Sequence, residues 1–172
     1  MATVTSVNIS KRKGTQKQPV GEEPQVVIAS RGLENDVHAG DWHRQVSFLA
    51  EESIQKAREM GLEVGPGAFA ENFTTEGIDL LDLPLGTQLR VGPEVLVEIS
   101  QIGKVCHTRC AIYHLAGDCI FPREGIFGVV LEGGTVKKGD DIEVVKRGDG
   151  TCAHTPPEAL AEVEAARKAG TL

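Results

Sequence analysis

The sequence predicts a mainly β protein, and three features of the chain support this fold class. The chain has 172 residues, which is the size of one ordinary domain with a short tail. Aromatic residues make up only 4% and glycine is frequent at 20 residues, a composition that favours tight turns between short strands. Several short segments alternate apolar and polar residues, as strands with one buried face do. We therefore expect a small β-barrel with few helices.

The expected strands are short segments, most of them followed by glycine or proline. They cover residues 4–9, 26–29, 88–91, 95–99, 126–131 and 142–144. The clearest pattern lies at 95–99, where Val95, Val97 and Ile99 form one firmly apolar face. Gly92 and Gly133 mark turns beside these strands. Hairpin-like units of this kind favour a closed or half-closed barrel, because closure removes exposed sheet edges.

Residues 51–60 are expected to form the best internal helix. Acidic residues begin this segment and basic residues follow in its later half, which suits the helix dipole. Gly61 lies just past the expected end, where glycine is the common C-terminal cap. The expected inner face consists of Ile54, Ala57 and Met60.

The composition changes after Val145, so we expect one domain at residues 1–145 and a tail at 146–172. Residues 146–152 are polar and predict a linker. Thr155 and Glu158 have the spacing of a capping box, with prolines between them, which predicts a helix over 156–169. Leu160 and Val163 are its only large apolar residues. We therefore expect this C-terminal helix to dock weakly or to be mobile.

The overall charge excludes some classes of partner. The formal net charge is −7 and the isoelectric point is near 5.3, so the surface is not built to collect phosphate backbones and we expect no nucleic-acid partner. The N-terminal residues lack the apolar core of a signal peptide, and no apolar run approaches a membrane span. We expect a cytoplasmic protein without a membrane partner. In that compartment the four cysteines serve as thiols or metal ligands rather than as disulfides.

Residues 103–119 hold the densest set of reactive side chains, including three of the four cysteines. Cys106 has basic neighbours that favour the thiolate, which is the nucleophilic and metal-binding form. These neighbours are Lys104, His107 and Arg109. Two cysteines four positions apart are a weak zinc signature, because structural zinc requires four closing ligands. Cys106 is the predicted reactive thiol, whereas Cys119 and Cys152 are expected to be small buried side chains.

Five segments together resemble a known family. They are residues 40–47 (GDWHRQVS), 66–74 (PGAFAENFT), 83–87 (LPLGT), 106–113 (CHTRCAIY) and 117–127 (GDCIFPREGIF). In this order they resemble the small stand-alone MOSC domains, named for the C-terminal region of molybdenum cofactor sulfurase, over roughly residues 3–145. The resemblance implies a mainly β fold built around a distorted MOSC-type β-barrel, with a few short helices.

The resemblance also implies a site. In the wider family one shared cysteine either carries sulfur as a persulfide or ligates molybdenum, and Cys106 matches it. Cys106, His107 and Arg109 are therefore the expected catalytic residues, with Cys106 as the expected metal ligand. The family's Glu-Asn pair, which holds the pterin in the cofactor-binding members, is matched by Glu71-Asn72.

Further cofactor-binding residues are expected in two other segments. The first twenty residues are basic and contain no acid, so Arg12, Lys13 and Lys17 are candidates to bind the phosphate of the cofactor, although a solvated loop is the simpler interpretation. His38, His43 and Arg44 lie in the Gly-rich loop that the family shares. They either line the same pocket or fix the shape of the loop by hydrogen bonds, and both interpretations stay open.

These residues support three functional hypotheses. The first is binding of a molybdenum (or tungsten) pterin cofactor, with Cys106 as sulfur carrier in sulfuration or maturation of that cofactor. The second is a molybdenum-cofactor-dependent reductase of N-hydroxylated compounds, whose electrons come from elsewhere because the chain has no flavin, haem or iron–sulfur signature. The third is a zinc-binding or redox-sensing interaction module. Its ligands would be Cys106, Cys110, His114 and Cys119.

The hypotheses differ in the partners that they require. A sulfur carrier needs a cysteine desulfurase or another sulfur donor, and it delivers sulfur to a molybdoenzyme or to proteins of cofactor synthesis. No segment resembles the pyridoxal-phosphate lyase of the sulfurases, so we expect pyridoxal phosphate only through a partner enzyme. Whether the chain is itself an enzyme stays open at this point.

Overall fold

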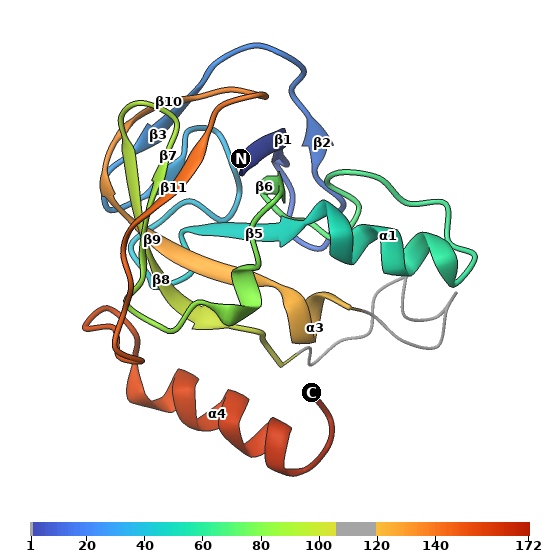
Figure 1. Ribbon diagram of the computed structural model, residues 1–172, viewed down its shortest axis with the longest axis vertical. Coiled ribbons are helices and arrows are strands. Elements are labelled where there is room, and N and C mark those ends of the chain that lie inside the picture. Colours follow the sequence, from blue (N-terminus) through green and yellow to red (C-terminus); the bar gives the residue numbers. More distant parts are fainter. Residues whose placement is uncertain (1, 106–119) are drawn as a thin grey trace.

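The computed structural model describes residues 2–105 and 120–172, and it is mostly β-structure, as expected (Figure 1). The main sheet has eight strands, which lie in the order β11 (Ile142–Lys146), β7 (Gln88–Val91), β8 (Val95–Ile102), β9 (Ile126–Glu132), β5 (Val46–Ala50), β6 (Phe73–Glu76), β1 (Thr3–Ile9) and β2 (Gln18–Pro19). A second sheet has three strands in the order β10 (Gly134–Val136), β3 (Gln25–Ile28) and β4 (Gly32–Leu33). The helices of the described residues are α1 (Glu51–Glu59), a 3₁₀ turn η1 (Leu80–Asp82), α3 (Phe121–Glu124) and α4 (Pro157–Lys168).

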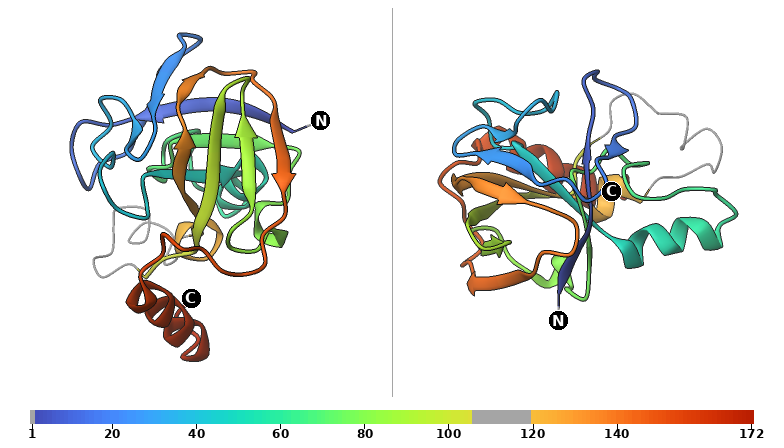
Figure 2. Two further views of the ribbon diagram at one scale, coloured as in Figure 1. Left: turned by 90° about the vertical axis from the view of Figure 1, so that its left-hand side faces the viewer. Right: turned by 90° about the horizontal axis from the view of Figure 1, so that it is seen from above.

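The main sheet curls until its two ends meet, but it does not close into a continuous barrel (Figure 2). β1 contacts the turn before β11 through one isolated bridge between Thr3 and Asp141. Beside it, the Val4 N–H donates to the Asp140 carbonyl at 2.8 Å, and the Gly139 N–H donates to the Val4 carbonyl at 2.7 Å. Because only this short contact joins the ends, a distorted barrel describes the fold loosely.

All of the expected strands are present in the structure. β8 runs three residues beyond the expected end, to Ile102, because its last residues pair with β9. β3 is not a fully buried strand, since Val27 is buried while Val26 is 44% exposed. The apolar run there alternates between a buried and an exposed face, as period two requires.

Two apolar clusters lie on opposite sides of β5 and β9. Phe48 and Ile126 belong to the larger cluster inside the curled sheet, whereas their neighbours Leu49 and Phe127 belong to a smaller cluster with side chains of α1 and α3. Successive side chains of a strand point to opposite faces, so both strands are buried on both sides. This packing fixes the ends of β8 and β9, where the candidate site lies.

α1 confirms the helix expected at 51–60. Ile54 and Ala57 are buried, as expected for the inner face. Met60 is 53% exposed, so the expectation that it belongs to the inner face is wrong: the helix ends at Glu59 and the backbone then turns away. Gly61 follows with φ 92°, a conformation that glycine adopts without strain.

The segment between β11 and α4 is anchored to β8. Cys152 is buried, and its thiol donates to Glu98 Oε1 at 3.1 Å. Burial, together with the Glu98 carboxylate, raises the pKa of the Cys152 thiol. The Thr155 hydroxyl donates to the Ser100 carbonyl at 2.5 Å. The expectation of a passive, buried cysteine is confirmed for Cys152, while Cys119 lies outside the described residues.

α4 lies at the C-terminal end of β8, near Ile102 (Figure 1). Its N-cap is Pro156, without a side-chain cap, so the capping box is wrong because Thr155 bonds to β8 instead. Val163 is the buried residue of the helix, and the Arg167 guanidinium donates to the Ile102 carbonyl at 2.9 Å. The helix is therefore held by the buried Val163, by the Arg167 hydrogen bond to β8 and by the anchored segment before it. No helix among the described residues is long and apolar enough to cross a membrane.

Candidate functional site

The loop between β4 and β5 lies over the ends of β8 and β9. His43 Nε2 is 2.7 Å from Gln101 Oε1. Gln101 Nε2 donates to the Gly103 carbonyl at 2.8 Å, so Oε1 must accept the proton of His43 Nε2. Gln101 in turn pairs with Phe127 in the β8–β9 ladder. Burial lowers the pKa of His43 more than the Gln101 hydrogen bond raises it, which favours the neutral imidazole.

Trp42 and Arg44 form an aromatic and basic surface on the same loop. The Trp42 indole N–H donates to the His38 carbonyl at 2.8 Å, and the two rings stack with centroids 6.5 Å apart. The Arg44 guanidinium carbon lies 4.6 Å from the Trp42 ring centroid and 5.5 Å from that of Phe127, distances typical of cation–π contacts. Trp42 is 37% exposed. The loop therefore presents a partly exposed aromatic side chain beside a positive charge.

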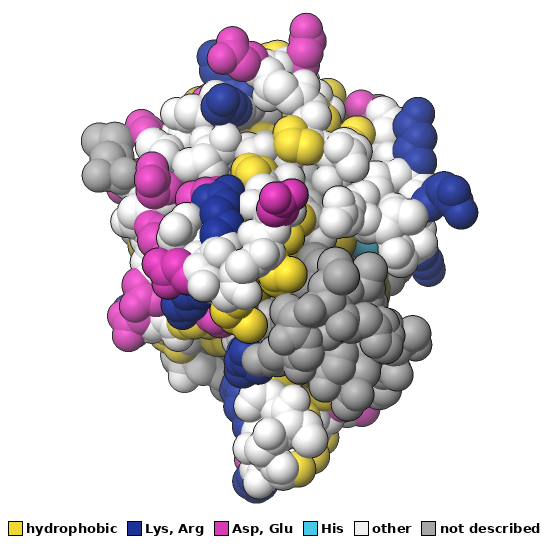
Figure 3. Space-filling view, turned by 90° about the vertical axis from the view of Figure 1, so that its right-hand side faces the viewer, with side chains coloured by type: hydrophobic (Ala, Val, Ile, Leu, Met, Phe, Trp, Pro, Cys, Tyr) yellow, Lys and Arg dark blue, Asp and Glu magenta, His cyan; other side chains and the backbone are white. Residues whose placement is uncertain are grey.

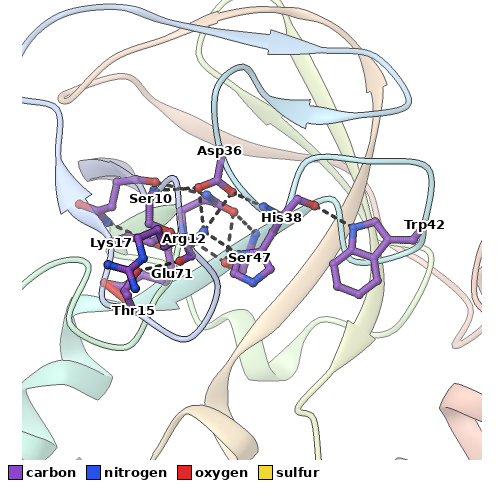
Figure 4. Close-up of polar contacts among 11 residues, drawn as sticks. Ser10, Arg12, Thr15, Lys17, Asp36, His38, Trp42, Ser47 and Glu71 are labelled. Atoms are coloured by element: carbon purple, nitrogen blue, oxygen red, sulfur yellow. Dashed lines mark hydrogen bonds and ion pairs between the residues drawn. The ribbon is translucent and has the colours of Figure 1, made fainter. Parts of the chain in front are cut away.

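Lys17, from the segment between β1 and β2, and Asp36, from this same loop, form an ion pair, and both side chains are fully buried (Figure 4). Lys17 Nζ lies 2.7 Å and 2.9 Å from the two Asp36 carboxylate oxygens. The Ser10 N–H also donates to Asp36 Oδ1, at 3.0 Å. Burial raises the pKa of Asp36, but the Lys17 contacts outweigh burial and leave this pKa below its ordinary value. Lys17, expected to bind the phosphate of a cofactor, has its ammonium group held inside the protein.

His38 is the point at which the buried ion pair reaches the surface. Its Nδ1 lies 2.8 Å from Lys17 Nζ, and its backbone N–H donates to Asp36 Oδ2 at 3.3 Å. Burial and the charge of Lys17 lower the pKa of His38 to about 4; Asp36 opposes this change, and Lys104 and Lys13 add to it. Three lysines from two parts of the chain therefore create a positive potential around a neutral imidazole.

The face that carries this site is basic at one edge. Figure 3 shows Lys and Arg side chains along that edge of the molecule, with a histidine close to them. Lys11, Arg12 and Lys13 are exposed in the segment between β1 and β2. The structure thus leaves Arg12 and Lys13 accessible, unlike Lys17.

Asn72 joins three strands inside the protein. Its Oδ1 accepts hydrogen bonds from the Ser47 N–H at 3.0 Å and the Ser47 hydroxyl at 3.3 Å, and its Nδ2 donates to the Asn8 carbonyl at 3.2 Å. Asn72 is 1% exposed. The amide therefore cross-links β5 to β1 just before β6 begins. Its predicted contact with a pterin stays untested, and its visible contacts are structural.

Glu71 is fully buried next to Asn72. One carboxylate oxygen accepts hydrogen bonds from the Gly67 N–H and from the Thr74 hydroxyl, the second of these at 3.2 Å. The other oxygen, Oε2, has no hydrogen-bond partner among the described residues. Burial, opposed by these hydrogen bonds, raises the pKa of Glu71 to about 7. Ionisation of this buried carboxyl group at neutral pH is therefore unfavourable.

The expected catalytic residues Cys106, His107 and Arg109 lie outside the described residues, as do Cys110 and His114. The structure does describe how the chain approaches them. The Gly103 N–H donates to the Gly125 carbonyl at 2.7 Å, and the Lys104 N–H donates to the Pro122 carbonyl at 2.8 Å. Two residues after Lys104 comes Cys106. Within residues 2–105 and 120–172, no group of three His, Cys, Asp or Glu side chains could hold a metal ion.

Sequence reasoning missed Gln101 and Phe127 as parts of the site. Both lie on strands that the sequence predicts, and neither has a chemistry that singles it out. Their roles depend on pairing across the β8–β9 ladder, which places Gln101 under His43 and Phe127 under Arg44. No local signal in the sequence reports that pairing.

The family model described as MOSC domain matches residues 34–143. The structure is similar to that of YiiM from Geobacillus stearothermophilus, with a TM-score of 0.66 and 24% identity over 87% of this chain and 78% of that one. It is similar to YiiM from Escherichia coli, with a TM-score of 0.66 and 19% identity over 99% and 94% of the two chains. The YuaD protein from Bacillus subtilis has a TM-score of 0.68 and 18% identity, over 82% of this chain and 93% of that one.

No curated protein matches the chain. The structural similarities concern the fold alone, whereas the family model rests on the sequence and spans more than half of the chain. Its span contains His38, Trp42, Arg44 and the Glu71-Asn72 pair, as well as Cys106. On this evidence the protein belongs to the MOSC domain family.

Proposed function

We propose that this protein binds a molybdenum or tungsten pterin cofactor and that Cys106 carries sulfur for the maturation of that cofactor. The observation that carries the proposal is the surface formed by His38, Trp42 and Arg44, which we call the loop surface. It lies on the strand ends from which the chain continues into Cys106. MOSC membership supports the same cofactor class.

The residues of the loop surface have the chemistry that such a cofactor requires. Its phosphate suits the positive potential that Lys13 and Lys104 create around His38. Its flat ring system suits the exposed Trp42 indole, which Arg44 holds in place. We assign these residues to cofactor binding. The buried contacts of Lys17 and Asn72 support a role in shaping the site rather than direct binding.

The bound cofactor would supply a metal centre with thiolate and oxygen ligands. The protein's own chemistry in our proposal is thiol exchange at Cys106. The Cys106 thiolate attacks the terminal sulfur of a donor persulfide, the sulfur–sulfur bond of the donor breaks, and the donor cysteine leaves as a thiolate. Cys106 then holds the persulfide, and the exchange needs no external oxidant. Such a donor is a cysteine desulfurase or an equivalent protein.

The first test measures molybdenum, tungsten and released pterin in protein purified from a host that makes the cofactor. Wild type is compared with Lys104→Glu, which reverses a charge near His38, and with Lys138→Glu, an exposed control in the turn after β10. We expect stoichiometric pterin in wild type and in the control, and a clear loss in Lys104→Glu. Absence of both metal and pterin from wild type would show that the proposal is wrong.

The second test addresses sulfur transfer. Wild type, Cys106→Ser and Cys152→Ser are incubated with a cysteine desulfurase and free cysteine, and their intact masses are measured. Because Cys152 is buried and bonded to Glu98, we expect one added sulfur atom on wild type and on Cys152→Ser but none on Cys106→Ser. An equal adduct on all three proteins contradicts the role of Cys106.

The same preparations separate the two other hypotheses. Reduction of an N-hydroxylated base with an artificial electron donor, without a sulfur adduct, would favour the reductase. Stoichiometric zinc that survives dialysis, with thiols that react only after denaturation, would favour the interaction module. All of that module's ligands lie outside the described residues, at Cys106, Cys110, His114 and Cys119.

A further inference from the structure

The buried contact between Lys17 and His38 indicates which nitrogen of the His38 ring carries the proton. The sequence alone does not show this. Lys17 Nζ has three hydrogen-bond contacts, two with the Asp36 oxygens and one with His38 Nδ1, at 2.7, 2.9 and 2.8 Å (Figure 4). An ammonium group has three protons and no acceptor site. His38 Nδ1 must then accept, so the single proton of the neutral imidazole lies on Nε2.

We infer that Lys17 is a positioning residue that holds His38 as the Nε2–H tautomer, so that His38 presents a hydrogen-bond donor to the bound ligand. The acceptor on that ligand is an anionic or carbonyl oxygen. The identity of the ligand rests on the proposed function, whereas the tautomer does not.

The charged form of Lys17 is required for this assignment. A neutral amine could satisfy the same three contacts by donating to Asp36 and accepting from a protonated Nδ1. That arrangement would bury the Asp36 carboxylate without a cation, which is strongly unfavourable in a protein interior. Burial lowers the pKa of Lys17, but two oxygens of Asp36 within 2.9 Å oppose this change and favour the ammonium. The ion pair therefore sets the direction of the hydrogen bond to His38.

The surroundings of His38 oppose a second proton on its ring. Burial and the charges of Lys17, Lys104 and Lys13 disfavour the imidazolium, whereas Asp36 favours it. Asp36 is already paired with Lys17, so its charge is largely neutralised. The pKa of His38, lowered to about 4, agrees with this balance. His38 therefore stays neutral over the physiological pH range.

The His38 ring is itself part of the loop surface. Within the part of the chain that the structure describes, no group forms a hydrogen bond with His38 Nε2. The ring is half-buried and stacks on Trp42, whose indole N–H is bonded to the His38 carbonyl. The backbone and one ring nitrogen are thus both fixed, which leaves Nε2–H as the ring's available group. A donor held in this way loses little entropy when a ligand binds.

The test is histidine NMR on the full chain, purified without added cofactor. Long-range proton–nitrogen correlations identify which nitrogen of each imidazole carries the proton. The spectra are recorded between about pH 8 and about pH 5, a range that contains the ordinary histidine pKa. We expect a protonated Nε2 and an unprotonated Nδ1 for His38, without titration over this range. His43 serves as an internal reference, because its hydrogen bond to Gln101 places the His43 proton on Nε2. A protonated Nδ1, averaged tautomers, or titration of His38 near pH of about 6.5 would overturn the inference.

A paired substitution removes the positioning group without leaving a buried charge. Lys17→Met together with Asp36→Asn takes away the ammonium and its counter-charge, so the fold does not have to bury an unpaired ion. We expect averaged tautomers for His38, because no ammonium group then requires Nδ1 to accept a hydrogen bond. The His43 signals should not change. An unchanged His38 spectrum in a folded double variant would show that Lys17 does not position the ring.

Ligand binding gives the functional readout. His38→Gln keeps an N–H donor and should retain most of the pterin, whereas His38→Leu should weaken retention by about tenfold or more, because it removes a hydrogen bond to a charged or polar oxygen. Equal retention by the two variants would overturn the donor role. A fixed Nε2–H tautomer in protein that never retains metal or pterin supports the role of Lys17 and contradicts only the proposed function.

Discussion

Replacement of Glu71 by glutamine is expected to remove a pH-dependent loss of stability from this protein. Glu71 is fully buried, and its Oε2 has no partner among the described residues. Its neighbours donate only to the other oxygen, through the Gly67 N–H and the Thr74 hydroxyl. A glutamine Oε1 can accept both hydrogen bonds but does not ionise. The substitution thus keeps the shape and two contacts while it removes the titration.

The size of this loss of stability follows from the pKa of Glu71 in the folded and in the unfolded protein. Its pKa is about 7 in the folded protein and 4.5 for an ordinary glutamate, so the folded state binds the proton more tightly than the unfolded state does. The stabilising contribution is fully present below the ordinary pKa and is lost as the pH rises through about 7. The difference between the two pKa values corresponds to about 3 kcal/mol in the free energy of unfolding.

The assay is chemical denaturation of wild type and Glu71→Gln at several pH values between about 4.5 and about 8, the range that spans both pKa values. Other titrating groups cancel in the difference between the two proteins. We expect that difference to change by about 3 kcal/mol in favour of the glutamine variant as the pH rises. Glu63→Gln, at an exposed position, is the matched control and should give parallel curves. Parallel curves for Glu71→Gln as well would refute the reasoning.

Two further predictions concern packing. Gly67 has φ 86°, and a Cβ there would overlap the Lys17 carbonyl oxygen, so Gly67→Ala should lower the free energy of unfolding by about 3 kcal/mol or more in urea denaturation. Gly65 has open space around it, and Gly65→Ala should change this free energy by less than about 1 kcal/mol; similar effects at both positions would contradict the close approach. Val163 is buried in α4, whereas Leu160 is 36% exposed. Val163→Ala should therefore speed amide hydrogen exchange across α4 more than Leu160→Ala does. The reverse order would show that the helix docks by another face.

The local elements of this protein were predictable because their signals are local. The strand at 95–99 follows from the alternation of Val95, Val97 and Ile99, and α1 follows from its charge pattern and Gly61. The family was also predictable, since short motifs such as those around Trp42 and Glu71 are read directly from the chain. The C-terminal helix was placed within one residue at each end.

Contacts between distant segments were not predictable in the same way. Thr155 has the spacing of a capping residue, yet its hydroxyl bonds to Ser100, because the anchored segment brings it to β8 first. Lys17 belongs to an exposed basic segment by its sequence neighbours, but the turn that follows β1 carries it inward to Asp36. A local pattern specifies which hydrogen bonds a residue can form, not which distant partner reaches it.

The sequence by itself determined six of the strands, α1 and the family, and it singled out Cys106 as the predicted reactive thiol. Only the tertiary structure decided that Asn72 cross-links strands, that Glu71 ionises with difficulty, and that Lys17 and Asp36 orient His38. The physical reason is that burial and charge pairing depend on which segments meet in space. Periodicity and spacing describe one segment at a time, whereas the proton positions of this site result from contacts between the segment that follows β1, the residues just before β6 and the loop that precedes β5.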